Sequence, residues 1–529
     1  MTPAAQISTA PQQRFPRLAA ACILLLTATL ALAWSHNKLL SQDEMFVLQT
    51  DSVSSVRQLI HIQHVCPISL DPLAYHLLAH AATKLFGQGA FALRLPSLLG
   101  YLLMQVCLFL FVRRNLGERA AVIAMAFPAL TATLFYAAEA RPYGLLLGLY
   151  ALTLLSWQAA TNQAEPSSTN PPESRTAALI TLTLSVALTL NAHYFGILLL
   201  IPLWAAELFR SLQRRRLDWP VLFAIVLGMA AIVFALPFQK AAGQFRLHYY
   251  NGGTVGLRTL TQSYRSLFMD YTHASLPTQH LLAIAFVLFA IALTAGCLYR
   301  WKTQTLGLPH AQAVFAIVLA ALPFFGFLLA RFVTHSIEVR YVLGAIIGIS
   351  ILLAAVLAPT LKSDRAFAFT VALLFVAIAA SGIQRIRASA AETAQTLATF
   401  TLTPSLKAQL LANPDGRLYM QSLGHFEVAQ YYTADSDLRS RLTLVYDATQ
   451  EIRWDGHDTH ALTAQHMLQF TTLPIVSFDH LSHAPGQHTF ILFHTGWDWT
   501  DQTFAQQHAR ITPLGTAFEG DAAAVQFIP

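Results

Sequence analysis

Charged residues are scarce in this sequence. Lys, Arg, Asp and Glu make up only 11% of its 529 residues and hydrophobic residues make up 55%, whereas soluble domains carry roughly 25% charged residues. The mean hydropathy is +0.49. This composition excludes an ordinary soluble protein and predicts an integral membrane protein. The formal net charge of +6 indicates Lys and Arg in cytoplasmic loops, so we expect no nucleic-acid partner.

Cysteine is also rare. Cys22, Cys107 and Cys297 lie inside apolar runs, and Cys66 stands alone in a polar segment. With four scattered cysteines and no CxxC pair, the sequence predicts neither a disulfide framework nor a cysteine metal site.

Long apolar runs are abundant. Crossing the hydrocarbon core of a bilayer takes about 20 mostly apolar residues. About eleven transmembrane helices are predicted, near residues 18–35, 94–112, 120–138, 143–160, 177–192, 194–209, 219–237, 280–299, 311–330, 341–358 and 366–383. The first run exceeds the apolar core of a signal peptide, so we expect an uncleaved anchor.

Basic residues in the short connections indicate the orientation. They fall on one side of the predicted membrane, at Arg113, Arg114, Arg119, Arg210, Arg214, Arg215, Arg216, Arg300, Lys302, Lys362 and Arg365. Because short cytoplasmic loops are enriched in Lys and Arg, the N-terminus is expected in the cytoplasm. An odd number of spans then places the C-terminus outside, in the periplasm of a bacterium with two membranes.

The composition changes near residue 385 and predicts two domains. Residues 1–384 form a transmembrane catalytic domain with long outer connections at 36–93 and 238–279, and residues 385–529 form a soluble periplasmic domain. Alternating strand and helix patterns in "GRLYMQSLGHFEVAQYY", "LTLVYD", "HTFILFHTG" and "AAAVQFIP" indicate an α/β fold. The predicted class is a polytopic α-helical membrane protein with a C-terminal soluble α/β domain.

A helix lying in the membrane interface is predicted over residues 71–87, "DPLAYHLLAHAATKLFG". One stripe at helical spacing is apolar, at Leu73, Leu77, Leu78, Ala81, Leu85 and Phe86. His76, His80 and Lys84 form the opposite stripe. The segment is too polar to span the bilayer, and its two faces suit the interface.

Ionisable and aromatic residues gather where predicted spans reach the outer face. Asp43 and Glu44 follow the first span in "SQDEMFVL". Further residues flank the third, fifth and tenth spans, namely Glu139, Arg141, Tyr143, His193, Tyr194, Arg340 and Tyr341. Ionisable residues at a bilayer edge are costly unless they are paired or functional, so this convergence indicates a binding or catalytic site.

Each candidate also has a structural interpretation, and both interpretations stay open at this point. Asp43 and Glu44 suit a solvated loop. Glu139 precedes a proline and suits the N-terminus of a helix. Arg340 suits an interfacial anchor, and His193 suits a hydrogen bond within the helix bundle.

The second outer connection mixes cations with tyrosines. Arg246 and Arg265 are its candidates for phosphate binding, because a guanidinium group donates two parallel hydrogen bonds. Neighbouring rings suit stacking on a sugar, and an ordinary aromatic belt is the alternative. No dense carboxylate cluster occurs on this face, so no metal site is predicted.

These motifs resemble the GT-C membrane glycosyltransferases. The resemblance covers most of residues 15–360 and rests on the Asp-Glu pair after the first span, "ALRLPSLLG", "EARPYGLLLGLYAL", "HYFGILLLIPL" and "VRYVLGAI" in that order. The chain is most similar to the bacterial family that includes lipid A aminoarabinose transferase and to the related protein O-mannosyltransferases. One departure is "HVCPISLDPLAYHLL", where relatives commonly have a His-Pro-Pro-Leu-Tyr-like segment.

The resemblance implies an inverting transferase that acts on the outer face of the membrane. Its donor would be a polyprenyl-phosphate sugar, and its acceptor a lipid, a glycan or a protein. Asp43 would accept the acceptor's proton with Glu44 supporting it, and arginines would stabilise the leaving phosphate. Some relatives use a divalent cation, but no cofactor is expected here.

Two other functions remain as alternatives. An oligosaccharide-transferring, ligase-like enzyme would use the same lipid carrier. A sugar-lipid transporter would place polar groups near the bilayer midplane and often show repeated halves, and neither feature is visible in the sequence. Fold analogy selects neither the sugar nor the acceptor.

Overall fold

The computed structural model describes residues 14–162, 172–246, 255–268, 276–335, 337–482, 486–494 and 499–527. The chain divides into two compact units. The membrane unit comprises Met1–Ser35, Arg94–Ala235 and Gly253–Gln384, and the second unit comprises His36–Leu93, Leu236–Gly252 and Arg385–Pro529. Residues 36–93, which we assigned to the first domain, therefore lie with the C-terminal segment.

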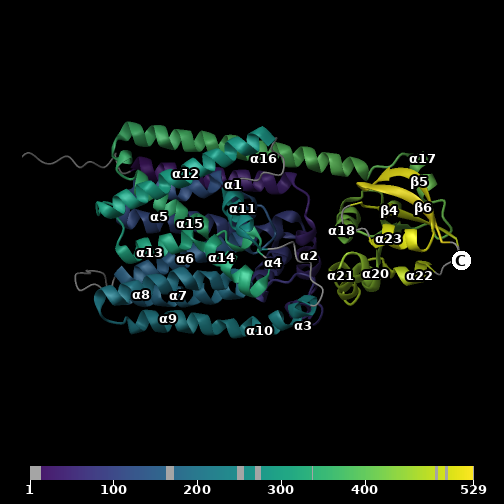
Figure 1. The fold of residues 1–529 in the computed structure, drawn as a ribbon, viewed down its shortest axis with the longest axis horizontal. Helices are drawn as coiled ribbons and strands as arrows, with labels where there is room; N and C mark the ends of the chain where they lie inside the picture. The colour runs from purple at the N-terminus through teal and green to yellow at the C-terminus, as the bar shows by residue number, and fades with distance from the viewer. Residues whose placement is uncertain are drawn as a thin grey trace, which may run out of the picture. The chain divides into compact units, whose positions relative to one another are not determined.

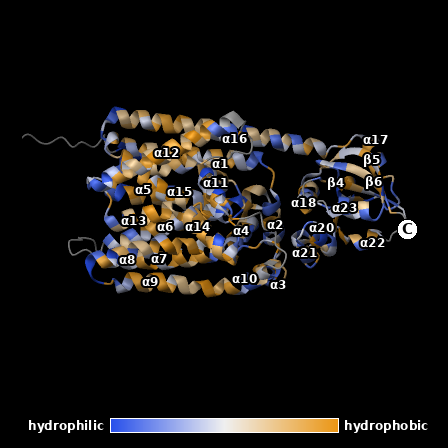
Figure 2. Ribbon diagram, in the orientation of Figure 1, coloured by the Kyte–Doolittle hydropathy of each residue, from blue (hydrophilic) through white to orange (hydrophobic). Residues whose placement is uncertain are grey.

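Helices make up the membrane unit, and most are rich in apolar residues (Figures 1 and 2). They are α1 (Arg14–Asn37), α5 (Ala90–Ala126), α6 (Tyr143–Asn162), α7 (Pro172–Ala192), α8 (Leu200–Arg214), α9 (Trp219–Ala230), α11 (Leu257–Phe268), α12 (Leu276–Lys302), α13 (His310–Ala320), α14 (Leu322–Leu329), α15 (Ala345–Leu357) and α16 (Asp364–Thr399). Short 3-10 turns connect several of them, including η2 (Ala132–Ala137), η3 (Tyr194–Leu199) and η7 (Val339–Tyr341).

The apolar helices define a multi-pass membrane protein. Among the described residues, seven helices are long and apolar enough to cross a membrane, or up to nine if each of two bent pairs is one span. This number is below the eleven segments expected for two reasons. The stretch Ala90–Leu130 covers the expected segment 94–112 and the first part of 120–138 but counts once, and Ala345–Leu357 is apolar but short.

Glycine and proline explain where the long helices break. Gly117 interrupts α5 with φ of 83°, a conformation that glycine adopts without steric cost. Pro323 lies in the first turn of α14, directly after α13 ends. Proline has no N–H to donate to the preceding turn, so α13 cannot continue through it as a regular helix.

Helices α5 and α6 approach each other closely because glycines line their contact. A Cβ atom on Gly148 would lie 2.3 Å from the carbonyl oxygen of Gly100, and one on Gly144 would lie 2.3 Å from that of Ser97. Gly144 and Gly148 form a small-xxx-small pair, the pattern that lets membrane helices pack backbone to backbone. This contact fixes the start of α6, where Tyr143 lies.

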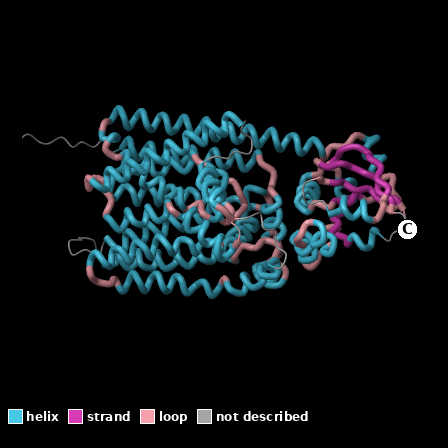
Figure 3. The backbone as a smooth tube through the Cα atoms, in the orientation of Figure 1, coloured by secondary structure: helices cyan, strands magenta, loops and turns pink. Residues whose placement is uncertain are grey.

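The second unit contains a six-stranded sheet (Figure 3). Its strands are β1 (Leu418–Met420), β2 (Leu442–Tyr446), β3 (Ile475–Ser477), β4 (Gln487–Leu492), β5 (Arg510–Ala517) and β6 (Gly520–Gln526). The order is β3-β2-β1-β4-β6-β5. The first four strands pair in parallel, and β6 pairs antiparallel with both β4 and β5. This arrangement confirms the predicted C-terminal α/β domain.

Helices occupy the connections of this sheet. They are α17 (Pro404–Leu410), α18 (Leu423–Tyr432), α19 (Ser436–Arg441), α20 (Ala448–Trp454), α21 (Thr459–Met467), α22 (Phe478–Ser482) and α23 (Trp499–Gln506). The residues 36–93 add α2 (Gln42–Asp51), α3 (Val56–Val65) and α4 (Leu73–Phe86), and α10 (Leu236–Ala242) follows α9. Phe46 and Ile68 pack into the same apolar core as Phe426 and Leu444, which explains why these distant segments form one unit.

The predicted interfacial helix corresponds to α4. Two residues of its polar stripe face the protein: His76 contacts the Asp51 carboxylate at 2.8 Å and His80 contacts the Asp51 carbonyl at 2.8 Å. The third, Lys84, is exposed. Its apolar stripe includes the exposed side chains of Leu78 and Leu85. An outward apolar face is what a helix at a lipid interface requires.

Candidate functional site

The motif "SQDE" begins helix α2 with a capping box. The Glu44 carboxylate accepts a hydrogen bond from the Ser41 backbone N–H at 2.9 Å, and the Ser41 hydroxyl accepts one from the Glu44 N–H at 3.4 Å. This reciprocal pair satisfies two backbone donors at a helix start. Lys38 lies 3.4 Å from the fully buried Glu44 carboxylate. Glu44 therefore serves as the capping acid of α2.

Asp43 occupies a different position from its neighbour. It lies in the first turn of α2 and is partly exposed, whereas Glu44 is buried. Adjacent residues of a helix point about 100° apart, so the capping box fixes Glu44 and leaves the Asp43 carboxylate on another side of the helix. Of the two acids, Asp43 is the one that solvent or a ligand can reach.

The membrane unit brings several predicted site residues into one chain of rings. Tyr143 lies with its ring centroid 5.1 Å from that of His193, and His193 lies 5.7 Å from Tyr341. Phe195 stacks on Tyr341 at 3.9 Å with the ring planes nearly parallel. Three segments far apart in sequence thus meet, at the start of α6, at η3 and at η7. We call Tyr143, His193, Phe195 and Tyr341 the ring cluster.

Two arginines flank the ring cluster. The Arg141 guanidinium lies 5.9 Å from the ring centroid of Tyr143, and the Arg340 guanidinium lies 5.9 Å from that of Tyr341. Arg265 is on α11, which packs against both η2 and η7. Planar guanidinium groups beside aromatic rings suit an anion that carries an apolar or sugar moiety.

His193 has a defined structural contact. Its Nδ1 atom accepts a hydrogen bond from the Phe195 backbone N–H at 3.1 Å and so caps η3. This contact holds the His193 ring in place within the ring cluster.

The remaining predicted residues lie around these groups or outside the described part. Glu139 is buried, and its carbonyl accepts a hydrogen bond from the Arg141 N–H at 2.8 Å in the bend before α6. Tyr194 is half-buried at the start of η3. Arg246 ends a short 3-10 turn, Gly243–Arg246, and its side chain lies outside the described residues.

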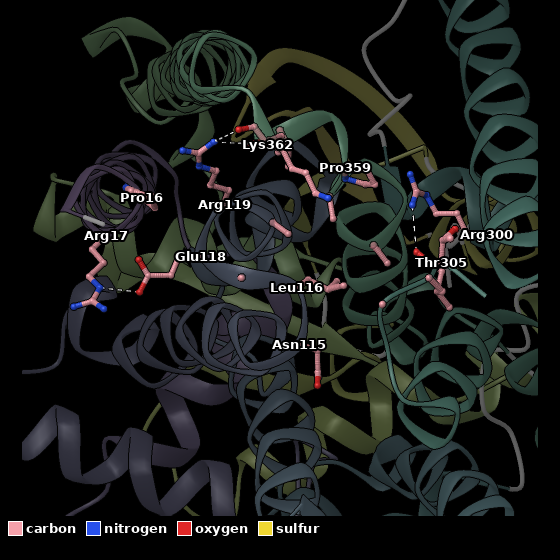
Figure 4. A pocket seen from close by; sticks show the side chains of 17 residues that line it. Pro16, Arg17, Asn115, Leu116, Glu118, Arg119, Arg300, Thr305, Pro359 and Lys362 are labelled. Atoms are coloured by element: carbon pink, nitrogen blue, oxygen red, sulfur yellow. Dashed lines mark hydrogen bonds and ion pairs between the residues drawn. The ribbon is translucent and has the colours of Figure 1, made fainter. Parts of the chain in front are cut away.

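The membrane unit also has a cavity of about 730 Å³ that contains none of the predicted site residues (Figure 4). Basic side chains line it together with one acid, at Arg17, Arg119, Arg300, Lys362 and Glu118. Arg17 donates to Glu118 at 2.8 Å, and Arg119 pairs with Asp364. Arg119, Arg300 and Lys362 are among the basic residues that we expect on the cytoplasmic side.

Two features were missed in the sequence, one in each unit. Phe195 completes the ring cluster. Its place in the aromatic motif "HYFG", beside the predicted His193 and Tyr194, was its only signal in the sequence. Glu427 is a fully buried acid on α18, and nothing in "GHFEVAQYY" separates it from a solvated helix acid. Among the described residues, no three His, Cys, Asp or Glu side chains group closely enough to hold a metal ion.

The architecture is the GT-C glycosyltransferase fold, as the sequence resemblance indicated. Residues 71–238 match the family model described as dolichyl-phosphate-mannose-protein mannosyltransferase. The chain is similar to the crystal structure of ArnT from Cupriavidus metallidurans in the apo state, with 14% identity, a TM-score of 0.59, and coverage of 96% of this chain and 98% of that one.

Two further solved structures share this fold. ArnT from Cupriavidus metallidurans bound to undecaprenyl phosphate is 15% identical, with a TM-score of 0.56 and coverage of 95% of this chain and 98% of that one. The archaeal oligosaccharyltransferase AglB from Archaeoglobus fulgidus, in complex with an inhibitory peptide and a dolichol-phosphate, is 10% identical, with a TM-score of 0.50 and coverage of 89% and 70%. No curated protein matches the chain in sequence.

Proposed function

We propose that the chain is an inverting glycosyltransferase that moves a sugar from a polyprenyl-phosphate-linked donor to a lipid, glycan or protein acceptor. The observation that carries the proposal is the ring cluster with Arg141 and Arg340 beside it. The fold supports it, and so does the undecaprenyl phosphate bound to the similar ArnT structure. We place the reaction and the C-terminal domain on the periplasmic side of a bacterial inner membrane, in contact with membrane lipids.

The arginines suit the leaving group of this reaction. As the bond between the anomeric carbon and the phosphate breaks, negative charge develops on the phosphate oxygens. Arg141, Arg340 and Arg265 provide fixed cationic donors that stabilise such charge more in the transition state than in the ground state. The rings of Tyr143 and Tyr341 provide flat apolar surfaces suited to one face of a sugar.

Asp43 suits the role of general base. The acceptor oxygen forms a bond to the anomeric carbon, its proton passes to the Asp43 carboxylate, and the electron pair of the breaking bond leaves with polyprenyl phosphate. This direct displacement inverts the anomeric centre and needs no covalent intermediate. The role requires a carboxylate that a substrate can reach, and Asp43 meets that requirement better than the buried Glu44.

Two alternatives make different predictions. An oligosaccharide-transferring enzyme would consume only donors that carry several sugars. A sugar-lipid transporter would move the donor across a bilayer without breaking it. A panel of monosaccharide and oligosaccharide donors, assayed for both cleavage and transbilayer movement, separates the three functions.

Arg340→Ala is expected to weaken the binding of undecaprenyl phosphate about 10- to 100-fold, the effect of losing a charge-assisted hydrogen bond. Equilibrium binding to protein in nanodiscs measures this loss. Arg331→Ala is the matched control, because Arg331 is an exposed arginine of the preceding segment. Equal affinities of both variants and wild type would remove Arg340 from the proposed site.

We also propose that the displacement needs no metal ion, because arginines can supply the positive charge that a divalent cation would otherwise provide at the phosphate. Turnover by purified protein is expected to be unchanged after dialysis against EDTA. Loss of turnover that Mg²⁺ or Mn²⁺ restores would show that this proposal is wrong.

A further inference from the structure

Helix α18 of the C-terminal domain packs against α2, the helix that carries Asp43. The Leu40 backbone N–H donates a hydrogen bond to the Tyr432 hydroxyl at 2.9 Å. Near the other end of α18, a Cβ on Gly424 would lie 2.7 Å from the Gln42 side-chain oxygen. The start of α2 therefore lies directly on the C-terminal domain.

Glu427 lies on the face of α18 that contacts α2. It follows Gly424 by three residues, so these two positions share one side of the helix, the side where Gly424 meets Gln42. Its side chain is 1% exposed. Among the described residues, neither carboxyl oxygen of Glu427 has a hydrogen-bond partner.

An ionised carboxylate in such a position is costly, because burial removes its water and no donor replaces it. Burial, and then the negative charge of Asp43, raise the pKa of Glu427 well above its ordinary value. The Glu427 carboxyl group therefore keeps its proton to a higher pH than an unburied glutamate does. A neutral acid carries one O–H donor, which a carboxylate lacks.

The other charged groups around this contact are accounted for. The elements packed against α18 are α2, β1 and β2. Besides Glu427, the titratable groups of these elements and of α18 itself are Asp43, Glu44, Asp51, Tyr419, Tyr446, His425, Tyr431 and Tyr432. Glu44 lies beside Lys38 and Asp51 beside His76. Asp43 is thus the acid whose charge acts on Glu427.

We infer that Glu427 is a positioning residue for the proposed reaction: it holds a neutral carboxyl group beside Asp43 and links the general base to the C-terminal domain. This inference rests on the proposed function for its catalytic part. When Glu427 ionises, a second negative charge faces Asp43 across the contact of α2 and α18. The two charges repel, and α2 loses its fixed position. Asp43 then accepts the acceptor's proton less effectively, so turnover declines at high pH.

The first test needs no substrate. A group whose pKa is higher in the folded than in the unfolded state stabilises the fold below its unfolded pKa, and that stabilisation is lost as the pH rises through the folded pKa. Glu427→Gln removes this titration and keeps the shape. The melting temperature of the variant minus that of wild type is therefore expected to rise by on the order of 2–4 °C between pH 5 and pH 7.

The same measurement in the Asp43→Asn background tests the link to Asp43. Without the Asp43 charge the pKa of Glu427 is raised less, so in a series extended to pH 10 the difference is expected to level off at a lower pH than in the wild-type background. Glu392→Gln, at an exposed acid on α16, is the control and is expected to show no pH-dependent difference. The inference would be overturned if the melting-temperature difference between Glu427→Gln and its parent does not change with pH. It would also be overturned if the pH dependence of that difference is the same in both backgrounds.

Turnover tests the catalytic part separately. Wild-type kcat is expected to decline at high pH. The fraction of its neutral-pH kcat that Glu427→Gln retains at high pH is expected to be at least about threefold larger than the fraction that wild type retains. If the melting temperatures behave as expected but the pH profile of kcat does not move, the positioning role is wrong. If no donor is turned over at all, the proposed function fails, while the melting temperatures still decide whether Glu427 and Asp43 interact.

Discussion

Asp43→Asn is expected to reduce turnover of the polyprenyl-phosphate sugar donor about 10²- to 10⁴-fold, the usual contribution of a general base. Asparagine keeps the size of the side chain but cannot accept the acceptor's proton. The melting temperature is expected to stay close to that of wild type, because Asp43 is partly exposed and the capping box is made by Ser41 and Glu44. Release of polyprenyl phosphate, measured by chromatography, gives the rate.

The control for this result is Glu392→Gln, which neutralises an exposed acid of the same unit and is expected to retain full turnover. Donor affinity separates chemistry from binding, since a general base acts in the transition state and its loss leaves the donor's dissociation constant nearly unchanged. Full activity of Asp43→Asn would show that "SQDE" only begins a helix, and Glu139 would become the next acid to test.

Gly148→Ala is expected to destabilise the membrane unit by at least the upper end of the roughly 1–3 kcal/mol typical of overpacking. The added Cβ would lie 2.3 Å from the Gly100 carbonyl oxygen, and the backbone cannot move away as a flexible side chain can. Gly148→Leu is expected to abolish the folded protein. The yield of monodisperse protein in detergent and its melting temperature measure both effects.

The matched control is Gly89→Ala, because a Cβ there would have nothing within 4 Å. It is expected to behave as wild type. If Gly148→Ala folds in normal yield but shifts α6, donor binding is expected to weaken, because α6 begins at Tyr143. Unchanged yield, melting temperature and donor binding together would contradict the close packing of α5 and α6.

Much of the membrane unit could be predicted from the sequence, because the signal for a buried apolar helix is local. The apolar runs, the breaks at glycine and proline, and the strands of the C-terminal domain each depend on a few consecutive residues. Which segments of the chain make up the second unit could not be predicted in this way. Phe46 and Ile68 join the core around Phe426 through contacts across more than 300 residues, and no local pattern encodes them.

The candidate site, too, could be predicted only in part. The ring positions Tyr143, His193 and Tyr341 could be predicted from conspicuous motifs. The capping role of Glu44 was also readable, since "SQDE" has the spacing of a capping box, but two adjacent acids drew attention to catalysis. Glu427 could not be found, because its significance comes from burial against α2 and not from its neighbours in the chain.

The most direct test of the account is whether the purified protein in nanodiscs converts a polyprenyl-phosphate sugar to free polyprenyl phosphate, with a membrane extract supplying acceptors. We predict that wild-type protein consumes one class of donor, that the transferred sugar has the inverted anomeric configuration, and that Asp43→Asn releases almost no polyprenyl phosphate. Binding of no polyprenyl phosphate, together with no cleavage of any donor in the panel, would contradict glycosyl transfer.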